Sequence, residues 1–212
     1  MPSAATLWAF AVTAFVVIVI PGPSVLFVVG RALGSGRRVA VLSVLGNALG
    51  EYVQVMLVAV GVGALAEQSV AAFTVLKLAG GAYLVYLGIQ TFRKRRSLAA
   101  ALGGMAEPVS DRRSFMQGFA VGATNPKTVV FLAAILPQFV DRGHGSIAVQ
   151  VLLLGLVFMA IAVLSDTAWA LAAGRFRAWF GRSPRRLELV GGTGGLAIVA
   201  VGAGLLVSGR KH

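Results

Sequence analysis

The chain has 212 residues, of which 58% are hydrophobic and 27 more are glycine. About 70% of it is therefore apolar, against roughly 45–50% in an average soluble domain. Charged residues make up 12%, which is about half of the usual share. This composition excludes a soluble globule and predicts an all-α integral membrane protein. Cysteine is absent, so disulfides and thiolate metal sites are excluded, and no cofactor is expected.

Six apolar segments follow one another along the chain. A helical span needs about 20 apolar residues, so six spans with short connections use nearly the whole sequence as one transmembrane domain, 1–212. The first segment has no basic n-region, so we expect a retained span and not a signal peptide. The expected spans are about 4–30, 39–65, 70–92, 115–140, 147–173 and 188–208.

The basic residues predict the orientation of these spans. The net charge is +12, but long apolar runs separate the basic residues, so nucleic acid is not an expected partner. Connections one, three and five carry three, six and five Lys or Arg residues, fourteen of the 19, and the opposite side carries only Arg142, Arg210 and Lys211. Because cytoplasmic loops retain positive charge, both termini are expected outside the cytoplasm.

The two halves of the sequence resemble each other. KLAGGAYL at 77–84 matches ELVGGTGGL at 188–196, and Pro-Gly-Pro at 21–23 has a counterpart in Asn-Pro-Lys at 125–127. This predicts two three-helix repeats, about 4–92 and 115–208, joined by a cytoplasmic loop of about 93–114. Because three is odd, the second repeat enters the membrane inverted. Inverted repeats with interrupted helices are typical of secondary transporters, whose substrate site lies between the halves.

Prolines inside spans one and four predict breaks in both helices. Each proline removes a backbone donor and leaves the carbonyl four residues earlier without its helical partner. The carbonyls predicted to be freed are those of Val17, Val19, Gly122 and Ala133, opposite Pro21, Pro23, Pro126 and Pro137. Irregular backbone at membrane depth persists only where protein or a water-filled cavity satisfies it.

Both breaks also have the pattern of a new helix start. Gly22 before Pro23, and Asn125 before Pro126, suit an N-cap followed by proline at the first helical position. The unpaired N–H groups of such a start can bind a carboxylate, and Ser24 and Asn125 add polar side chains. The alternative is that the prolines only kink the helices for packing.

Charged residues inside the predicted spans complete the candidate site. Glu51 and Asp166 each cost about 2.5–3.5 kcal/mol at the centre of a span, so they are expected to face a cavity or a partner. Either could carry a coupling proton or bind a substrate ammonium group, and Asn47 lies one turn before Glu51 on the same face. The expected substrate-binding residues are Pro21, Gly22, Pro23, Ser24, Asn47, Asn125, Pro126 and Lys127.

Two other interpretations of these charges remain open. Glu51 and Asp166 could form internal ion pairs with Lys127 and Lys77. Alternatively, their oxygens could bind the cation in an exporter of a hard metal ion or another small cation. An enzyme is not expected, because Ser165–Asp166 has no histidine or lysine at an obvious spacing. Small-xxx-small spacings such as Gly46/Gly50 and Gly118/Gly122 permit close helix approach, which leaves a homo-oligomer open without specifying one.

Three segments resemble the lysine/homoserine exporter (LysE/RhtB) family: VVIVIPGPSVLFVVGRALGSGRRVA, KLAGGAYLVYLGIQTFR and GFAVGATNPKTVVFLAAILPQF. The similarity covers nearly the whole chain. It implies a six-span exporter of amino acids or their derivatives in the bacterial inner membrane, working by proton antiport. The family's motifs fall at 21–23, at 125–127, and at Pro137 and Gln138. Gly194 and Gly195 depart from the repeat opposite Tyr83, so the predicted cavity need not be symmetric.

Overall fold

A computed structural model of the chain describes residues 2–66, 70–93, 109–141, 143, 145–175 and 184–207. In these residues the secondary structure is helical and contains no strand, which confirms the all-α prediction there. The elements are α1 (Ala4–Val19), α2 (Pro23–Gly34), α3 (Arg37–Ala66), α4 (Val70–Arg93), α6 (Asp111–Ala123), α7 (Pro126–Ala134), the 3-10 helix η1 (Leu136–Phe139), α8 (Ile147–Arg175) and α10 (Pro184–Val207).

Two helical segments, Arg37–Gly61 of α3 and Ile147–Arg175, are long and apolar enough to cross a membrane. Two bent pairs also qualify when each is taken as one span: α1 with α2, at 55°, and α6 with Pro126–Phe139, at 44°. The described residues thus support two to four spans by length and composition. Six spans stay a prediction; among the residues that the structure describes, α4 contributes a shorter apolar stretch, Leu78–Gln90.

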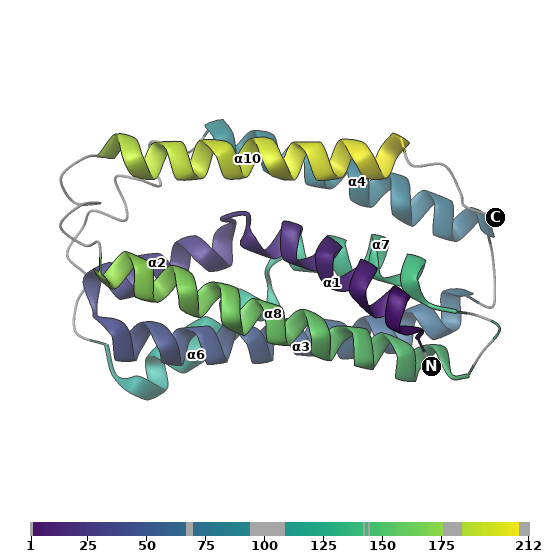
Figure 1. The fold of residues 1–212 in the computed structure, drawn as a ribbon, viewed down its shortest axis with the longest axis horizontal. Coiled ribbons are helices and arrows are strands. Elements are labelled where there is room, and N and C mark those ends of the chain that lie inside the picture. Colours follow the sequence, from purple (N-terminus) through teal and green to yellow (C-terminus); the bar gives the residue numbers. More distant parts are fainter. Residues whose placement is uncertain are drawn as a thin grey trace.

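The helices run along a common long axis (Figure 1), with α3 packed against both α6 and α8. Helices α4 and α10 pack on each other in a layer at the top of the view, and α4 also contacts α7. The start of α1 and the end of α10 lie at one end of the bundle, on the right. Helices α3, α6 and α10 begin at the other end.

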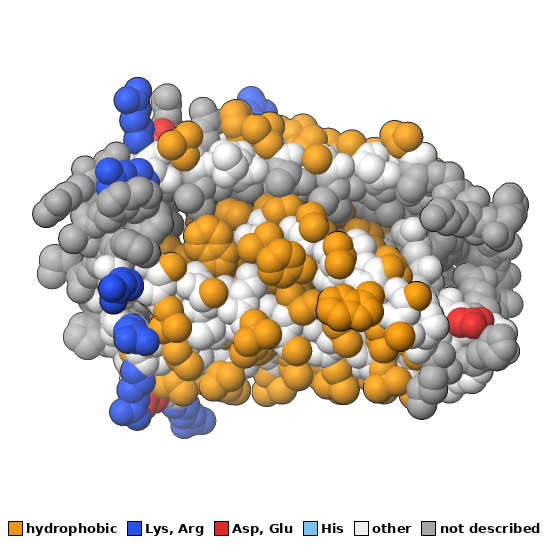
Figure 2. All heavy atoms as spheres, in the orientation of Figure 1, with side chains coloured by type: hydrophobic (Ala, Val, Ile, Leu, Met, Phe, Trp, Pro, Cys, Tyr) orange, Lys and Arg blue, Asp and Glu red, His pale blue; other side chains and the backbone are white. Residues whose placement is uncertain are grey.

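Basic side chains gather at the end where α3, α6 and α10 begin, while hydrophobic side chains cover the middle of the face shown in Figure 2. The helix ends at this side carry Arg31, Arg37, Arg38, Arg93, Arg112, Arg113, Arg175, Arg185 and Arg186. Arg38 donates to the Asp111 carboxylate at 2.6 Å and so joins α3 to α6 here. An apolar belt with a basic edge is the pattern expected of a membrane protein.

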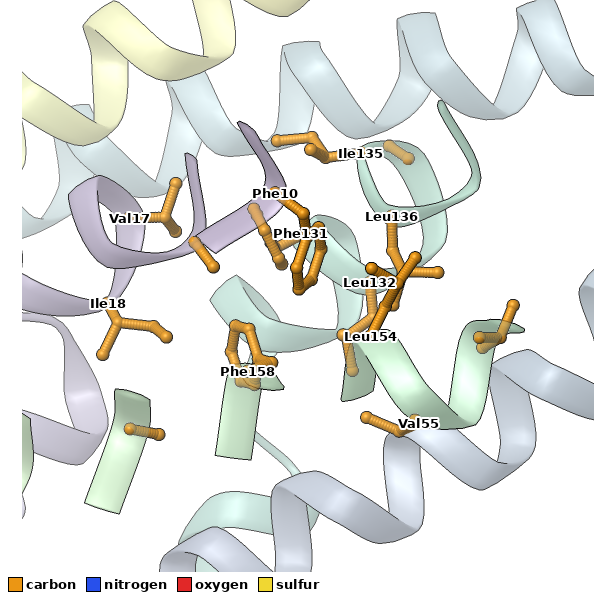
Figure 3. Close-up of a cluster of buried hydrophobic side chains, with 14 of the residues drawn as sticks. Phe10, Val17, Ile18, Val55, Phe131, Leu132, Ile135, Leu136, Leu154 and Phe158 are labelled. Atoms are coloured by element: carbon orange, nitrogen blue, oxygen red, sulfur yellow. The ribbon is translucent and has the colours of Figure 1, made fainter. Parts of the chain in front are cut away.

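The main hydrophobic core lies where α1, α3, α7 and α8 meet (Figure 3). Phe131 of α7 stacks on Phe158 of α8 with ring centroids 5.3 Å apart, and its ring lies 5.9 Å from that of Phe10 in α1. Both Phe10 and Phe131 are fully buried. Aromatic packing of this kind adds to the burial energy, so the core fixes the half-helices α1 and α7 against α8.

Glycines allow α3 and α6 to approach until their backbones touch. A Cβ added at Gly46 or Gly50 of α3 would lie 2.1 or 2.2 Å from a carbonyl oxygen of α6. In the other direction, a Cβ at Gly118 or Gly122 would lie 2.2 or 2.0 Å from a carbonyl oxygen of α3. The two spacings predicted to permit close approach therefore face each other within one chain. This contact brings Asn47 of α3 beside the second helix break.

Candidate functional site: a buried polar cluster at two helix breaks

The first break separates α1 from α2 and exposes carbonyl groups at the end of α1. Gly22 is the N-cap of α2 and Pro23 follows it in the first turn, as predicted. The Lys127 ammonium donates to the carbonyls of Val17 and Ile20, at 3.1 and 2.9 Å. The Trp169 indole donates to the Val19 carbonyl at 3.3 Å. Side chains from α7 and α8 thus satisfy the carbonyls that the prolines of the first break were predicted to free.

The second break separates α6 from α7 and has the predicted cap. Asn125 is the N-cap of α7, and its side-chain oxygen accepts from the Lys127 backbone N–H at 3.1 Å. Pro126 takes the first turn of the helix. The Gly122 carbonyl, predicted to be freed, accepts from the Gln54 side chain at 2.7 Å. At both breaks, the freed backbone groups are bound by side chains from other helices.

Seven polar side chains from four helices meet at these breaks, and we call them the polar cluster. None is more than 5% exposed. They are Ser24 of α2, Asn47, Glu51 and Gln54 of α3, Asn125 at the start of α7, Thr128 of α7, and Asp166 of α8. The cluster therefore unites the polar side chains of the predicted site, apart from Lys127, with two further residues. Pro21 and Gly22 are buried beside it, Pro126 is half-buried and Pro23 is exposed.

The two carboxyl oxygens of Glu51 differ in their hydrogen bonds within the polar cluster. Its Oε1 accepts from Thr128 Oγ1 at 3.0 Å and from Asn125 Nδ2 at 3.3 Å, and Ser24 Oγ lies 3.4 Å from the same atom. Its Oε2 is buried without a hydrogen-bond partner among the described residues. One oxygen of this carboxyl group is thus held by up to three donors and the other by none.

A chain of hydrogen bonds connects the surroundings of Glu51 to Asp166. Asn125 Nδ2 donates to Ser24 Oγ at 2.8 Å, and Ser24 Oγ donates to Asn47 Oδ1 at 2.9 Å. Asn47 Nδ2 then donates to Asp166 Oδ2 at 3.2 Å. Because a serine hydroxyl has a single hydrogen, Ser24 donates to either Asn47 or Glu51 at one time. A change of protonation or charge at one acid can therefore change the hydrogen bonds of the other.

Lys127 lies at the polar cluster but points toward the first break. The residue is 5% exposed, and its ammonium binds the Val17 and Ile20 carbonyls at the end of α1. In the described part of the chain, no ion pair joins it to Glu51 or Asp166. The internal ion pair considered for Lys127 is therefore absent from this conformation. The ion pair considered for Lys77 involves a side chain outside the described residues.

Sequence reasoning missed two members of the polar cluster, Gln54 and Thr128. The sequence contained a feature that marks each of them. Gln54 follows Asn47 and Glu51 at the i+7 and i+3 positions, which places all three on one helical face. Thr128 follows directly after the Asn-Pro-Lys motif, in the first turn of the new half-helix. A search for polar residues on the helical face of Glu51 would have found Gln54, and a search of the first turn after the second break would have found Thr128.

An apolar pocket of 490 Å³ opens between α1 and α8, next to the first break. Trp169 and Ser165, neighbours of Asp166 on α8, contribute to its wall with Val19 of α1. Ligand pockets commonly measure about 300–1,000 Å³ and are mostly apolar with a few polar groups. Its lining residues are Phe15, Val19, Ile161, Leu164, Ser165, Ala168, Trp169 and Ala172.

Bent apolar helices around a buried polar cluster define the chain as a membrane protein of transporter type. Comparison with known families agrees: residues 15–209 match the model of the LysE type translocators. The chain belongs to the LysE family of translocators. As transporters, such proteins are not enzymes.

Individual relatives extend this comparison over nearly the whole chain. The homoserine/homoserine lactone efflux protein of Salmonella typhimurium is 34% identical over 203 residues, 96% of each chain. A leucine efflux protein of an Enterobacter species is 28% identical over 93% of each chain. A membrane protein of Vibrio cholerae is 34% identical over 79% of this chain and 82% of its own. No solved structure matches the chain.

Proposed function

We propose that this protein is a secondary transporter that exports an amino acid or amino-acid derivative across the bacterial inner membrane by proton antiport. The observation that carries the proposal is the polar cluster, where both helix breaks meet two buried carboxyl groups. Buried ionisable groups in a membrane protein are costly and usually mark a substrate or proton pathway. The homoserine and leucine efflux names of the relatives support amino acids as the substrate class.

Six spans arranged as two inverted three-helix repeats form part of this proposal. Each half has a bent pair, then a helix of 30 or 29 residues, then a helix of 24 residues. Because α1 corresponds to α6 in this arrangement, the packing of α3 against α6 has its counterpart in that of α8 against α1. An inverted repeat would place the substrate site between the halves, where the two breaks meet.

The substrate carboxylate is proposed to bind at the two half-helix starts. The start of α2 at Gly22–Ser24 and the start of α7 at Asn125–Lys127 each carry the partial positive charge of a helix N-terminus. Ser24 and Asn125 are hydrogen-bonded to each other at 2.8 Å, so both starts reach the same place. Pro21, Pro23 and Pro126 contribute by holding the backbone in the broken conformation.

The coupling proton is proposed to move through Glu51 or Asp166. Neither acid is more than 4% exposed, and Ser24 and Asn47 connect them by hydrogen bonds. An acid that releases its proton on one side of the membrane and regains it on the other couples the proton gradient to substrate movement. The basic end of the bundle is proposed to face the cytoplasm, with both termini in the periplasm.

Inside-out membrane vesicles test this proposal directly, because export from the cell becomes uptake into the vesicle. We expect uptake of at least one labelled amino acid, with homoserine and leucine first in the panel, and dependence on a pH gradient. The double variant Glu51→Gln with Asp166→Asn should reduce uptake to the level of vesicles without the protein, while the protein still inserts. Asp111→Asn is the matched control, because its carboxylate binds Arg38 at the surface.

Two outcomes would contradict the proposal. Normal uptake by the double variant would exclude a role for the two acids. Uptake of metal cations in place of amino acids would favour the cation exporter, although the described residues contain no group of three His, Cys, Asp or Glu side chains suited to a metal ion.

A further inference from the structure

Two buried oxygen atoms of the polar cluster accept no hydrogen bond, and they lie one turn apart on α3. Glu51 Oε2 and Gln54 Oε1 have no partner among the described residues, although both side chains are 96% buried, with 4% exposed. An unsatisfied buried polar atom costs about 1–3 kcal/mol, and each one in a native structure calls for an explanation.

The orientation of the Gln54 amide is fixed by the second helix break. Its Nε2 donates to the Gly122 carbonyl at 2.7 Å and lies 3.4 Å from the Asn125 carbonyl. Because a carbonyl accepts hydrogen bonds only, the amide nitrogen must face these two groups. The amide oxygen therefore points away from the break as a fixed acceptor.

The orientation of the Glu51 carboxyl group is fixed in a similar way. Its Oε1 is held by Thr128, Asn125 and Ser24, which leaves Oε2 as the free oxygen. Glu51 binds the side chain of Asn125 and Gln54 binds its backbone carbonyl. Positions i and i+3 of a helix are neighbours on its surface, about 5–6 Å apart at Cβ. Both side chains thus contact the same residue, and each has one oxygen left free.

We propose that Glu51 Oε2 and Gln54 Oε1 form a two-point acceptor for the primary ammonium group of the transported amino acid. An ammonium group has three N–H donors and a positive charge, so it can satisfy both oxygens and neutralise the carboxylate. This inference rests on the proposed export function and deepens it. It assigns substrate binding to Glu51, leaves the coupling proton to Asp166, and makes Gln54 a specificity residue for a primary amine.

Competition in inside-out vesicles tests the acceptor pair. Uptake of labelled homoserine, or of leucine if homoserine is not taken up, is measured against three unlabelled competitors: the same amino acid, its N-methyl form and its N,N,N-trimethyl form. Wild-type protein should prefer the primary amine over the trimethyl form by roughly tenfold to a hundredfold, as expected for one or two hydrogen bonds to a charged group. In Gln54→Met, which removes one acceptor, this preference should fall by about tenfold.

The controls separate substrate recognition from general damage. Gln150→Met removes another buried glutamine, whose side chain binds the Asp141 backbone, and should leave the preference unchanged. Gln54→Glu, as a protonated carboxyl group, keeps one donor for the Gly122 carbonyl and one free acceptor oxygen, and it should retain the preference even where Gln54→Met folds poorly. A preference that stays constant in Gln54→Met, or is lost in Gln54→Glu, overturns the acceptor pair. If wild-type vesicles take up no amino acid, the export proposal itself fails, and this inference fails with it.

Discussion

The ammonium nitrogen of Lys127 lies 2.9 Å from the carbonyl oxygen of Ile20, although 107 residues separate them in the chain. Lys127 follows the break in the second half of the sequence, and Ile20 belongs to the break in the first half. This lysine, in the first turn of α7, therefore caps the end of α1. A cation at the C-terminal end of a helix also interacts favourably with the helix dipole. The two breaks are thus joined by one side chain as well as by the polar cluster.

Replacing Lys127 by methionine should destabilise the protein through the end of α1. The change keeps an unbranched side chain but leaves the Val17 and Ile20 carbonyls without their donor. An unsatisfied buried acceptor costs about 1–3 kcal/mol, so we expect a clear fall in the thermal unfolding midpoint in detergent. Arg113→Met, at an exposed position of α6, is the control. Equal stability of Lys127→Met and the control would show that the cap contributes nothing.

Gly22 makes room for this lysine. A Cβ at Gly22 would lie 3.2 Å from Lys127 Nζ and 3.3 Å from two carbons of its side chain. These contacts are tight, but the end of a lysine chain can shift. Gly22 therefore serves both as the predicted N-cap and as the open path along which Lys127 reaches α1.

Adding a single methyl group at Gly122 should disrupt the contact between α3 and α6. The new Cβ would lie 2.0 Å from the Asn47 carbonyl oxygen, and backbone cannot yield as a flexible side chain does. We expect Gly122→Ala to cost about 1–3 kcal/mol, the range for overpacked sites, and to reduce uptake because Asn47 and Asn125 are pushed apart. Gly61→Ala is the matched control, since a Cβ there meets nothing within 4 Å, and alanine favours a helix.

Stability and uptake of the Gly122→Ala protein should be measured on the same preparation. A protein as stable and as active as Gly61→Ala would mean that α3 and α6 separate freely. That result would contradict the close backbone contact on which the position of the polar cluster depends.

Several features of the site could be predicted because they are local in the sequence. The N-caps at Gly22 and Asn125 need only a cap residue followed by proline, and both are present in the structure. The freed carbonyls of Val17, Val19 and Gly122 follow from the geometry of proline in a helix. The glycine pairs that face each other between α3 and α6 were also visible in the sequence, as small residues spaced four apart.

The partners of these groups could not be predicted, because they come from distant segments. Nothing in the sequence near Val19 indicates that Trp169 binds its carbonyl, 150 residues away. The sequence likewise left open whether Lys127 pairs with a buried carboxylate, and in the structure its ammonium binds the backbone carbonyls of Val17 and Ile20. Which of several polar groups a long side chain reaches depends on how the helices pack, and that is decided by the whole chain.

Single cysteines should report the orientation of the bundle, since the natural chain has none. Gly143→Cys lies between η1 and α8, and Arg112→Cys lies in the first turn of α6; both positions are exposed. With the basic end in the cytoplasm, a membrane-impermeant maleimide added to intact cells should label Gly143→Cys and leave Arg112→Cys unmodified. In inside-out vesicles the pattern should reverse. Labelling of Arg112→Cys from outside the cell would place the termini in the cytoplasm.

Thr128 offers the most selective test of the polar cluster, because valine has nearly the same shape. Thr128→Val removes the hydroxyl that donates to Glu51 Oε1 at 3.0 Å and adds no bulk. Losing a hydrogen bond to a charged group costs about 1.5–3 kcal/mol, so uptake should fall by roughly tenfold or more, with the protein still folded and inserted. Thr124→Val makes the same chemical change at an exposed threonine whose hydroxyl donates to the Ala120 carbonyl. Uptake that falls equally in both variants would point to a general effect on α6 and α7, while a loss confined to Thr128→Val would tie transport to the Glu51 carboxyl group.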